Sequence, residues 1–513
     1  MISEKRRKNL ILLAMTTSTA LIFLNATLLP VALPTIQREL NISSVSLQWI
    51  INAYLLANAA FVIAGGRLGD LFGHRRLFCI GVVLYSVSSV MGSLAETGWW
   101  LIMSRAIQGS GGALMTPSGM SLLIHAFPGN ERGKAIGKMV AIGSLFLSIG
   151  PFIGGAFTEY LSWRYAFLIN PPVAILGVLL TLKVVPKSKP KKGRFDFLGF
   201  ITMSSGIFCL TLALMQGKVW GWSSGIVLFL FLLALSFFCA VCGLEKKVQD
   251  PFFQFRLFKN RTFLGGCLLI LCTQFILMIT VFWPLYFQQV FMDSPMVAGL
   301  VTVIATIPLM LFAPIGGSLA DKRGACFPIV VGFICLAGSL IWFAFALSWQ
   351  NTVLLQPALF LFGLGIAFVM TPASSATLSA VPKTQTGVAT GMYNTLRFTG
   401  ATMGVAILGA MQINLQEGMF TQKLQQNPET AALNPVLYEG LLGNLPHAIQ
   451  AAKDLRPEVL TYVKSALLNA ATAAFSLMHL VAAGIAILGL IIALQFLRKK
   501  EGSVKGKKEG AQK

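Results

Sequence analysis

Long runs of apolar residues, separated by short polar segments, dominate this chain. A helix of about 20 apolar residues is long enough to cross the hydrocarbon core of a bilayer. We therefore expect an all-α polytopic membrane protein. The pattern predicts fourteen transmembrane helices, near residues 10–33, 48–66, 77–95, 99–124, 136–158, 165–185, 198–216, 223–244, 262–285, 296–319, 327–347, 353–378, 387–411 and 467–497.

The composition agrees with this prediction and excludes an ordinary soluble protein. Of the 513 residues, 55% are hydrophobic and only 11% are charged, and the mean hydropathy is +0.74. Soluble domains carry about 25% charged residues. The net charge of +22 comes from Lys and Arg in the short segments between apolar runs, which favours contact with a lipid bilayer and argues against nucleic acid as a partner.

The same basic residues predict the orientation of the chain. Counted from a cytoplasmic N-terminus, 31 of the 40 Lys and Arg residues lie on the inner side of the spans and 7 on the outer side. Positive residues stay preferentially on the cytoplasmic side of a membrane. We expect a multi-pass protein of the plasma (inner) membrane with both termini in the cytoplasm.

A short charged string occurs twice where an apolar run ends, and we call the two copies the first latch (residues 66–76) and the second latch (residues 317–324). Their aspartates, Asp70 and Asp321, stand 251 residues apart. The first latch follows the second predicted span, whereas the second follows the tenth rather than the eighth. A duplicated six-helix bundle with two inserted helices, roughly 198–244, explains this offset.

The chain accordingly divides into three parts. Residues 1–185 form an N-terminal six-helix bundle, residues 186–250 a linker with two inserted transmembrane helices, and residues 251–513 a C-terminal six-helix bundle. The last part includes a hydrophilic segment at about 412–465, which we interpret as an outer loop with short helices, and a basic cytoplasmic tail.

The first latch combines a tight turn with opposite charges. Gly66 and Gly73 permit close approach and unusual backbone angles at the turn. Asp70 can pair with Arg75, with Arg76 or with the end of a neighbouring helix. The second latch lacks the trailing basic pair, so we expect it to hold less firmly.

Four strings in the N-terminal half resemble motifs of one family. The first latch resembles the loop that follows the second span in that family, and residues 105–112 resemble the family's motif in the fourth span. Residues 150–155 resemble the fifth-span antiporter motif, and residues 163–171 the entry to the sixth span. In this order and spacing, the chain resembles the major facilitator superfamily, specifically its fourteen-span drug:proton antiporter branch (EmrB/QacA type). The resemblance implies the major facilitator fold, with two six-helix bundles plus two inserted helices.

The resemblance also implies roles for the first latch and the fifth-span motif. The first latch would hold the outward-facing state by closing the cytoplasmic side. The fifth-span motif would control helix bending, because proline removes a backbone donor and glycines leave one helix face bare. Its residues are Gly150, Pro151, Gly154 and Gly155.

Polar residues within the spans mark a candidate cavity, because a charged group inside a membrane generally faces a cavity or a partner. Arg105 lies in the fourth span at about the depth of Asn25, and Arg397 lies in the thirteenth. The resemblance implies a role for Arg105 in coupling or in the polarity of the cavity. The candidate coupling and cavity residues are Asn25, Arg105, Gln108, Asn394 and Arg397.

Asn25 stands where the family usually has Asp, and none of the 18 acidic residues falls clearly inside a span. Asn cannot carry a proton. A cavity with arginines and without a carboxylate is expected to prefer neutral or anionic amphiphiles. Proton coupling is therefore expected outside the first span, where Asp70, Asp321, His125 and His479 can titrate.

These observations predict a secondary active transporter that exports hydrophobic neutral or anionic compounds by proton-linked alternating access, as multidrug exporters do. A proton-independent facilitator or importer of a small organic solute on the same fold is the alternative. A membrane-embedded enzyme is more remote, because the four histidines have no metal or triad spacing and no phosphate-binding loop occurs. We expect a small amphiphilic substrate and protons as partners and no cofactor or metal, and the sequence leaves a periplasmic adaptor open.

Overall fold

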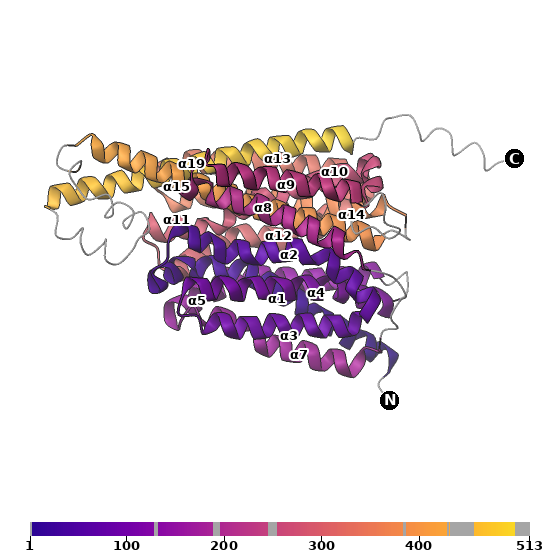
Figure 1. Ribbon diagram of the computed structural model, residues 1–513. Coiled ribbons are helices and arrows are strands. Elements are labelled where there is room, and N and C mark those ends of the chain that lie inside the picture. The colour runs from indigo at the N-terminus through magenta and orange to yellow at the C-terminus, as the bar shows by residue number, and fades with distance from the viewer. Residues whose placement is uncertain are drawn as a thin grey trace.

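The computed structural model describes residues 3–127, 132–187, 195–244, 254–382, 386–427, 430 and 456–497. Within these residues all regular secondary structure is helical, and the long helices run side by side (Figure 1). The helices of the first half are α1 (Glu4–Leu40), α2 (Ser44–Phe72), α3 (His74–Ser93), α4 (Gly98–Ala126), α5 (Arg132–Tyr160), α6 (Tyr165–Leu168) and α7 (Asn170–Val184). They are followed by α8 (Phe197–Trp220), α9 (Gly225–Leu244), α10 (Arg261–Leu277), α11 (Trp283–Gln289), α12 (Pro295–Arg323), α13 (Cys326–Ala346), α14 (Thr352–Ser379), α15 (Thr386–Gln425) and α19 (Pro457–Phe496).

Each of the fourteen predicted spans corresponds to one long helix or to one interrupted pair. The pairs are α6 with α7, and α10 with α11, the latter joined by a 3₁₀ turn over Met278–Val281. In the described part of the chain, thirteen segments are long and apolar enough to cross a membrane. The fourteenth, α4, is less apolar because it carries several glycines and Arg105, and it packs between α2 and α3. The all-α membrane fold predicted from the sequence is confirmed.

Local sequence signals set where the helices begin. The side chains of Ser43, Thr97 and Ser294 each accept a backbone hydrogen bond from the residue three positions later, at the starts of α2, α4 and α12. Asn260 caps α10 in a similar way. These caps satisfy backbone donors that a helix leaves free at its first turn, so the loops need only a few residues to reverse the chain.

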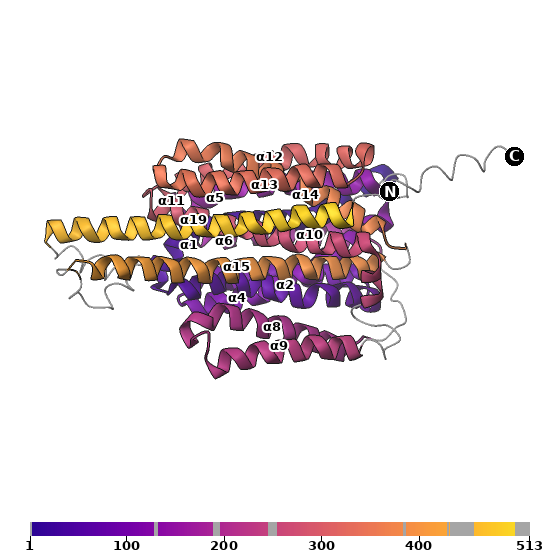
Figure 2. The same ribbon diagram turned by 90° about the horizontal axis from the view of Figure 1, so that it is seen from above.

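The first seven helices pack mainly against one another, and so do α10 to α19. The two groups meet along two seams, α2 against α15 and α5 against α12. Helices α8 and α9 form a pair on one flank of the bundle, where α8 packs on both α2 and α15 (Figure 2). The inserted pair therefore covers one of the two seams.

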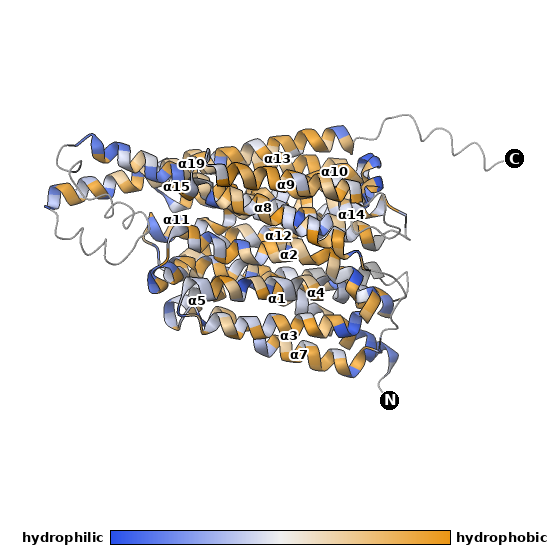
Figure 3. Ribbon diagram, in the orientation of Figure 1, coloured by the Kyte–Doolittle hydropathy of each residue, from blue (hydrophilic) through white to orange (hydrophobic). Residues whose placement is uncertain are grey.

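The ends of the bundle are polar and its middle is apolar (Figure 3). The start of α1 and the end of α19 lie at one end, which we call the termini end (Figure 1). At the opposite end, the hairpin end, the last turns of α15 and the first turns of α19 project beyond the other helices. Residues 412–425 and 457–465 thus continue two 40-residue helices where short helices were expected, and residues 428–429 and 431–455 lie outside the described residues.

The two latches share one backbone turn. Gly73 and Gly324 end α2 and α12 with φ angles of 93° and 83°, a region that side chains rarely allow. Each glycine N–H donates to the carbonyl oxygen four residues earlier, at 2.9 Å. The duplicated string therefore produces the same turn twice, at the termini end of both halves.

Candidate substrate-binding and gating site

Arg105 lies at the centre of the first half and is only 3% exposed. Its Nη1 donates to Asn25 Oδ1 at 3.0 Å and also to Gln108 Oε1, and its Nε donates to the Ile50 carbonyl oxygen at 3.1 Å. Its guanidinium also lies over the Tyr54 ring, 4.3 Å from the centroid. Arg105 is thus joined to α1, α2 and its own helix by contacts that partly offset the cost of burying a charge.

The network around Arg105 continues into α3 and α7. Gln108 Nε2 donates to Ser89 Oγ at 2.7 Å, and Asn170 Nδ2 donates to the same oxygen at 3.1 Å. Gln108, Ser89 and Asn170 are completely buried. Tyr85 joins α3 to α1, since its hydroxyl donates to the Leu21 carbonyl oxygen at 3.2 Å. A chain of polar contacts therefore crosses the whole first half.

Glycines in the fourth-span motif create the space for this network. A Cβ on Gly109 would lie 2.3 Å from the Tyr54 carbonyl oxygen, so α4 can touch α2 there only without a side chain. A Cβ on Gly112 would lie 3.4 Å from the Tyr54 hydroxyl and 3.3 Å from Asn58 Nδ2. The small residues thus let the helices approach closely and leave room for polar side chains between them.

Arg397 lies on α15, across the seam from Tyr54, and has very different surroundings. Its guanidinium is within electrostatic range of Tyr54 and Tyr393 and lies 5.7 Å from the Phe398 ring centroid. Its Nε is buried and has no hydrogen-bond partner in the described part of the chain. The hydroxyls of Tyr54 and Tyr393 are also buried without a partner there. Asn394 is half-buried, and the structure gives it no hydrogen bond to Arg397.

Carboxylates are absent from the core of the described residues. The fully buried polar side chains include Arg105, His479 and several amides and hydroxyls, but no Asp or Glu. Asp70, Glu159 and Asp321 lie at or near helix ends. The seam between α2 and α15 therefore presents positive charge and unpartnered polar atoms without a resident counter-ion.

In the first latch, a histidine lies against Asp70. His74 Nε2 lies 3.4 Å from Asp70 Oδ1. Arg75, expected as a partner of Asp70, donates through Nη2 to the Leu182 carbonyl oxygen at 2.7 Å and so fastens α3 to α7. Arg76 is exposed. Gly66 has ordinary helical space around it, with the Pro117 side chain 3.8 Å from a hypothetical Cβ.

The fifth-span motif packs against helices of both halves. A Cβ on Gly150 would lie 2.0 Å from Thr27 Oγ1, and one on Gly154 would lie 2.5 Å from the Leu28 carbonyl oxygen, both on α1. A Cβ on Gly155 would lie 2.6 Å from the Pro295 carbonyl oxygen at the start of α12. Pro151 also contacts α12, because its carbonyl oxygen would lie 2.3 Å from a Cβ on Gly299 of that helix. The motif is where α5 touches both α1 and α12.

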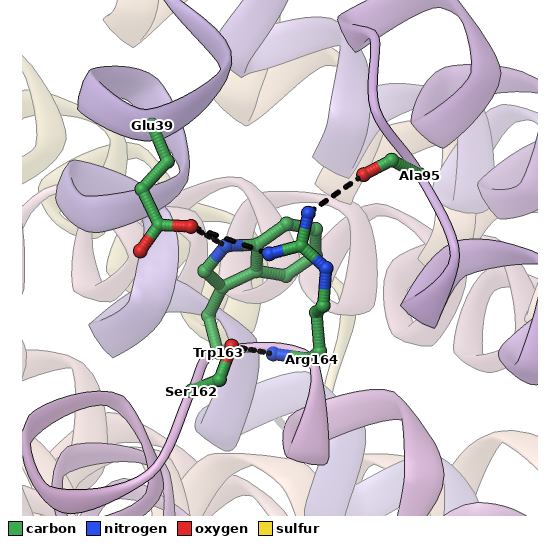
Figure 4. Close-up of polar contacts among 5 residues, drawn as sticks. All are labelled: Glu39, Ala95, Ser162, Trp163 and Arg164. Atoms are coloured by element: carbon green, nitrogen blue, oxygen red, sulfur yellow. Dashed lines mark hydrogen bonds and ion pairs between the residues drawn. The ribbon is translucent and has the colours of Figure 1, made fainter.

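The string at residues 163–171 forms a clamp at the hairpin end (Figure 4). Trp163 Nε1 donates to Glu39 Oε2 at 2.7 Å, and Arg164 Nη1 lies 3.3 Å from the same oxygen. Arg164 Nη2 also donates to the Ala95 carbonyl oxygen at 3.1 Å. Its guanidinium stacks 4.5 Å above the Trp163 ring. The clamp ties the end of α1 to the turns before α4 and α6.

Comparison with known proteins agrees with this architecture. The family model described as the Major Facilitator Superfamily matches residues 15–405. The chain belongs to the major facilitator superfamily. It is therefore a multi-pass integral membrane transporter rather than an enzyme.

Several curated proteins are similar to this major facilitator transporter. One is the tetracenomycin C resistance and export protein of Streptomyces glaucescens, 30% identical over 416 residues that cover 80% of this chain and 77% of that protein. Another is the riboflavin transporter RibZ of Clostridioides difficile, 32% identical over 390 residues that cover 75% and 84%. The multidrug resistance protein Stp of Mycobacterium tuberculosis is 31% identical over 414 residues, covering 79% and 76%.

Solved structures support the fold of this transporter. A bacterial homologue of the human lysosomal transporter Spinster superposes with a TM-score of 0.63 at 16% identity and covers 96% of this chain and 99% of its own. The xylose transporter XylE from E. coli gives a TM-score of 0.62 at 14% identity, with the same coverage. At such identities the likeness concerns the fold alone.

Sequence reasoning missed part of the polar network of this major facilitator protein. Tyr54, Asn58 and Ser89 were not singled out, and His74 was not recognised as the partner of Asp70. One usable signal was present, because Asn52, Tyr54 and Asn58 are polar residues in an otherwise apolar span. Asn52 turned out to face the inserted pair, with its Nδ2 2.8 Å from Met215 Sδ on α8.

In this fold, His479 is held by hydrogen bonds and by stacking on aromatic rings. Its Nε2 accepts a hydrogen bond from Trp283 Nε1 at 3.0 Å, and its Nδ1 lies 2.7 Å from the Phe475 carbonyl oxygen. Its ring stacks on Phe343 at 4.3 Å between centroids. The neutral imidazole, with one nitrogen donating and the other accepting, satisfies both contacts, which favours a packed residue over a proton carrier.

Proposed function

We propose that this transporter exports hydrophobic compounds that are anionic or neutral, in the manner of a multidrug exporter. In this proposal the termini end faces the cytoplasm of a plasma (inner) membrane, and transport is driven by a proton gradient. The division into two six-helix bundles, with residues 186–250 as a linker and inserted pair, is part of the same proposal.

The observation that carries the substrate class is the buried Nε of Arg397, which has no hydrogen-bond partner among the described residues, in a part of the bundle where those residues place no buried carboxylate. A charge held away from water is costly unless a counter-charge or hydrogen bonds accompany it. Arg105 has such hydrogen bonds from the protein itself, whereas the described residues supply none to Arg397 Nε. An anionic group on a substrate would supply them at the seam between the two halves.

Three other features support alternating access. The seam between α5 and α12 is joined near the hairpin end, where Glu159 Oε2 accepts the Met296 N–H at 2.9 Å. Nearer the middle, Ser148 Oγ donates to the Thr306 carbonyl oxygen at 3.0 Å. The latches lie at the opposite end. Contacts at the two ends can therefore alternate as one half rocks against the other.

Proton coupling would then use groups outside α1, because Asn25 cannot titrate. Asp70, Asp321 and His125 remain the candidates among those named from the sequence, and Asp70 has the strongest geometric support through its pair with His74. The alternative is a proton-independent facilitator or importer of a small organic solute. The similarity to a named riboflavin transporter favours keeping this second candidate in the test.

The test is transport by purified protein in vesicles, with three analogues of one aromatic skeleton carrying a carboxylate, no charge or an amine. We expect transport of the anionic and neutral analogues and its acceleration by an imposed pH gradient. Arg397→Gln is expected to lower transport of the anion at least tenfold, the effect of about 1.4 kcal/mol, while the neutral analogue is affected much less. Arg397→Lys should retain part of the anion transport.

Lys464→Gln is the matched control, because it removes one exposed positive charge from the projecting part of α19. It should transport all three analogues as the wild type does. Strict preference of the wild type for the cation would refute the proposed substrate class. Equal rates with and without a pH gradient would favour the facilitator.

A further inference from the structure

A cavity of about 480 Å³ lies at the termini end of the first half, away from Arg105 and the seam. Small-ligand sites usually have volumes of about 300–1,000 Å³. The starts of α1 and α3, the ends of α2 and α4 and the segment after α7 meet around this cavity. Its lining residues are Glu4, Arg7, Lys8, Ile11, Gly69, Asp70, His74, Leu122, His125, Ala126, Val185, Pro186 and Lys187.

The lining carries more positive than negative charge. Arg7, Lys8 and Lys187 contribute three cations, against the two carboxylates of Glu4 and Asp70. Glu4 is already paired, with its Oε1 3.6 Å from Lys8 Nζ. Arg7 is held in place through its Nε, which donates to a backbone carbonyl oxygen of α7 at 3.2 Å. An anion entering the cavity would therefore meet a lining with an excess of positive charge, in which Arg7 is held in place.

Two histidines face each other in the same lining. The ring centroids of His74 and His125 are 6.5 Å apart. His125 Nδ1 lies 2.7 Å from the Ser121 carbonyl oxygen, to which it donates, so its other ring nitrogen is directed elsewhere. His74 Nε2 lies against Asp70. The two imidazole rings therefore add nitrogen donors to the lining.

Buried polar atoms beside the cavity lack partners. His74 Nδ1 and Ser118 Oγ are both buried and have no hydrogen-bond partner in the described part of the chain. Both lie next to Gly69, at 2.3 and 3.2 Å from a hypothetical Cβ on that residue. Ser118 is completely buried. Buried polar groups in proteins are almost always hydrogen-bonded, so the wall behind Gly69 holds two polar atoms whose hydrogen bonds the described residues do not supply.

We propose that this cavity binds a phosphate-bearing anion, held by Arg7, Lys187 and the two histidines. A phosphate group offers several acceptor oxygens to such a cluster of donors. Two sources share this chemistry: the headgroup of an anionic phospholipid, which a cavity at the end of a transmembrane bundle can reach, and a free phosphate. His74 belongs to this cluster and also lies against Asp70, so occupancy of the cavity is linked to the first latch.

The test uses full-length protein in a phosphate-free nonionic detergent and follows its thermal unfolding with increasing ligand. The probes are short-chain phosphatidylglycerol, short-chain phosphatidylcholine and inorganic phosphate. A ligand that binds the folded state raises the unfolding midpoint in a concentration-dependent way. We expect a saturable rise with phosphatidylglycerol or with inorganic phosphate, and none with zwitterionic phosphatidylcholine.

Arg7→Gln is expected to weaken binding roughly fivefold, the effect of about one surface charge. His125→Gln is expected to weaken it measurably, because it removes a ring nitrogen donor from the lining. Asp70→Asn is expected to tighten it, because a negative charge leaves the lining. Arg256→Gln is the control: it removes an exposed cation at the same end of the other half and should not change binding.

The source of the anion follows from competition. If inorganic phosphate displaces phosphatidylglycerol, the site takes free phosphate as well as lipid. If it does not displace the lipid, the site is specific for a lipid headgroup. Equal stabilisation by phosphatidylcholine, no stabilisation by either anion, or unchanged binding in Arg7→Gln and His125→Gln would overturn the proposal. None of these readouts depends on transport, so the proposed export function is tested separately.

Discussion

The surroundings of Arg105 and Arg397 differ although both arginines lie deep in the membrane-spanning bundle. Arg105 donates to two side chains and a backbone carbonyl oxygen and stacks on Tyr54. Arg397 faces the same tyrosine from the other half, with a buried Nε that has no partner among the described residues. The Arg105 guanidinium has several partners within the protein, whereas the described residues supply no hydrogen bond to Arg397 Nε.

This difference separates a positioning role from a binding role. A buried charge with a complete set of partners holds helices together, and removing it leaves those partners without a donor. A buried charge without partners costs stability in the resting protein and recovers that cost when a ligand arrives. Under the proposed function, Arg105 would therefore serve mainly the architecture of the first half, and Arg397 would contact the substrate.

The largest effect is expected from Arg105→Gln. The change leaves the Ile50 carbonyl oxygen and Asn25 without their buried donor, and such losses cost about 3 kcal/mol in total. Arg105→Lys should fail to rescue, because an ammonium cannot reproduce the planar contacts of guanidinium. Unfolding of the purified protein would show a lowered midpoint in both variants and an almost unchanged one in Arg397→Gln. Equal destabilisation by the two glutamine variants would remove the distinction between the arginines.

A second comparison concerns the two latches. Asp70 is paired with His74 and partly buried, whereas Asp321 is exposed. Asp70→Asn is expected to unbalance the two conformations by about 1–3 kcal/mol and to reduce vesicle transport severely, with normal abundance in the membrane. Asp321→Asn should have a clearly smaller effect. Full transport by Asp70→Asn would refute a gating role for the first latch.

The sequence predicted the helices well because membrane spans are defined by length and hydropathy alone. It also predicted unusual backbone angles at Gly66 and Gly73. Gly73 has one, whereas Gly66 lies within α2. Contacts between distant segments were harder. The depth estimate placed Asn25 near Arg105, but no local pattern distinguishes Arg105 from Arg397, because each depends on which residues other helices bring to it. The projecting hairpin was missed since its polar helices carry no transmembrane signal.

Asn25→Asp tests how far the Arg105 network tolerates a charge. The new carboxylate would lie where Asn25 Oδ1 now accepts from Arg105 at 3.0 Å, so an ion pair would mask it. We expect a modest shift of preference toward cationic substrates and a stronger dependence on the pH gradient. The double variant with Arg105→Gln should enlarge the shift. Vesicle transport of an anionic and a cationic amphiphile measures both, and an unchanged preference in the double variant would contradict the idea.

The smallest effect concerns two carboxylates at the hairpin end, of which one accepts a hydrogen bond and the other has a buried oxygen without a partner among the described residues. Glu159 accepts the Met296 N–H, whereas Asp293 Oδ2 is buried without a partner in the described residues. Burial raises the pKa of the Asp293 carboxyl above its ordinary value of about 4. Because this pKa is higher in the folded than in the unfolded protein, the folded state is more stable when Asp293 is protonated. The free energy of unfolding therefore falls as the pH rises from the unfolded to the folded pKa of Asp293.

Asp293→Asn, which cannot ionise, is therefore expected to unfold at a slightly higher temperature than the wild type at pH 7. The difference should shrink on acidification and vanish once the pH falls below the ordinary aspartate pKa, because the wild-type carboxyl is then protonated in both states. Asp321→Asn, which changes an exposed carboxylate, is the control and should show no such difference. A gain that stays constant across the pH range would mean that packing or hydrogen bonding of the amide, rather than desolvation of the carboxylate, separates Asp293 from Glu159.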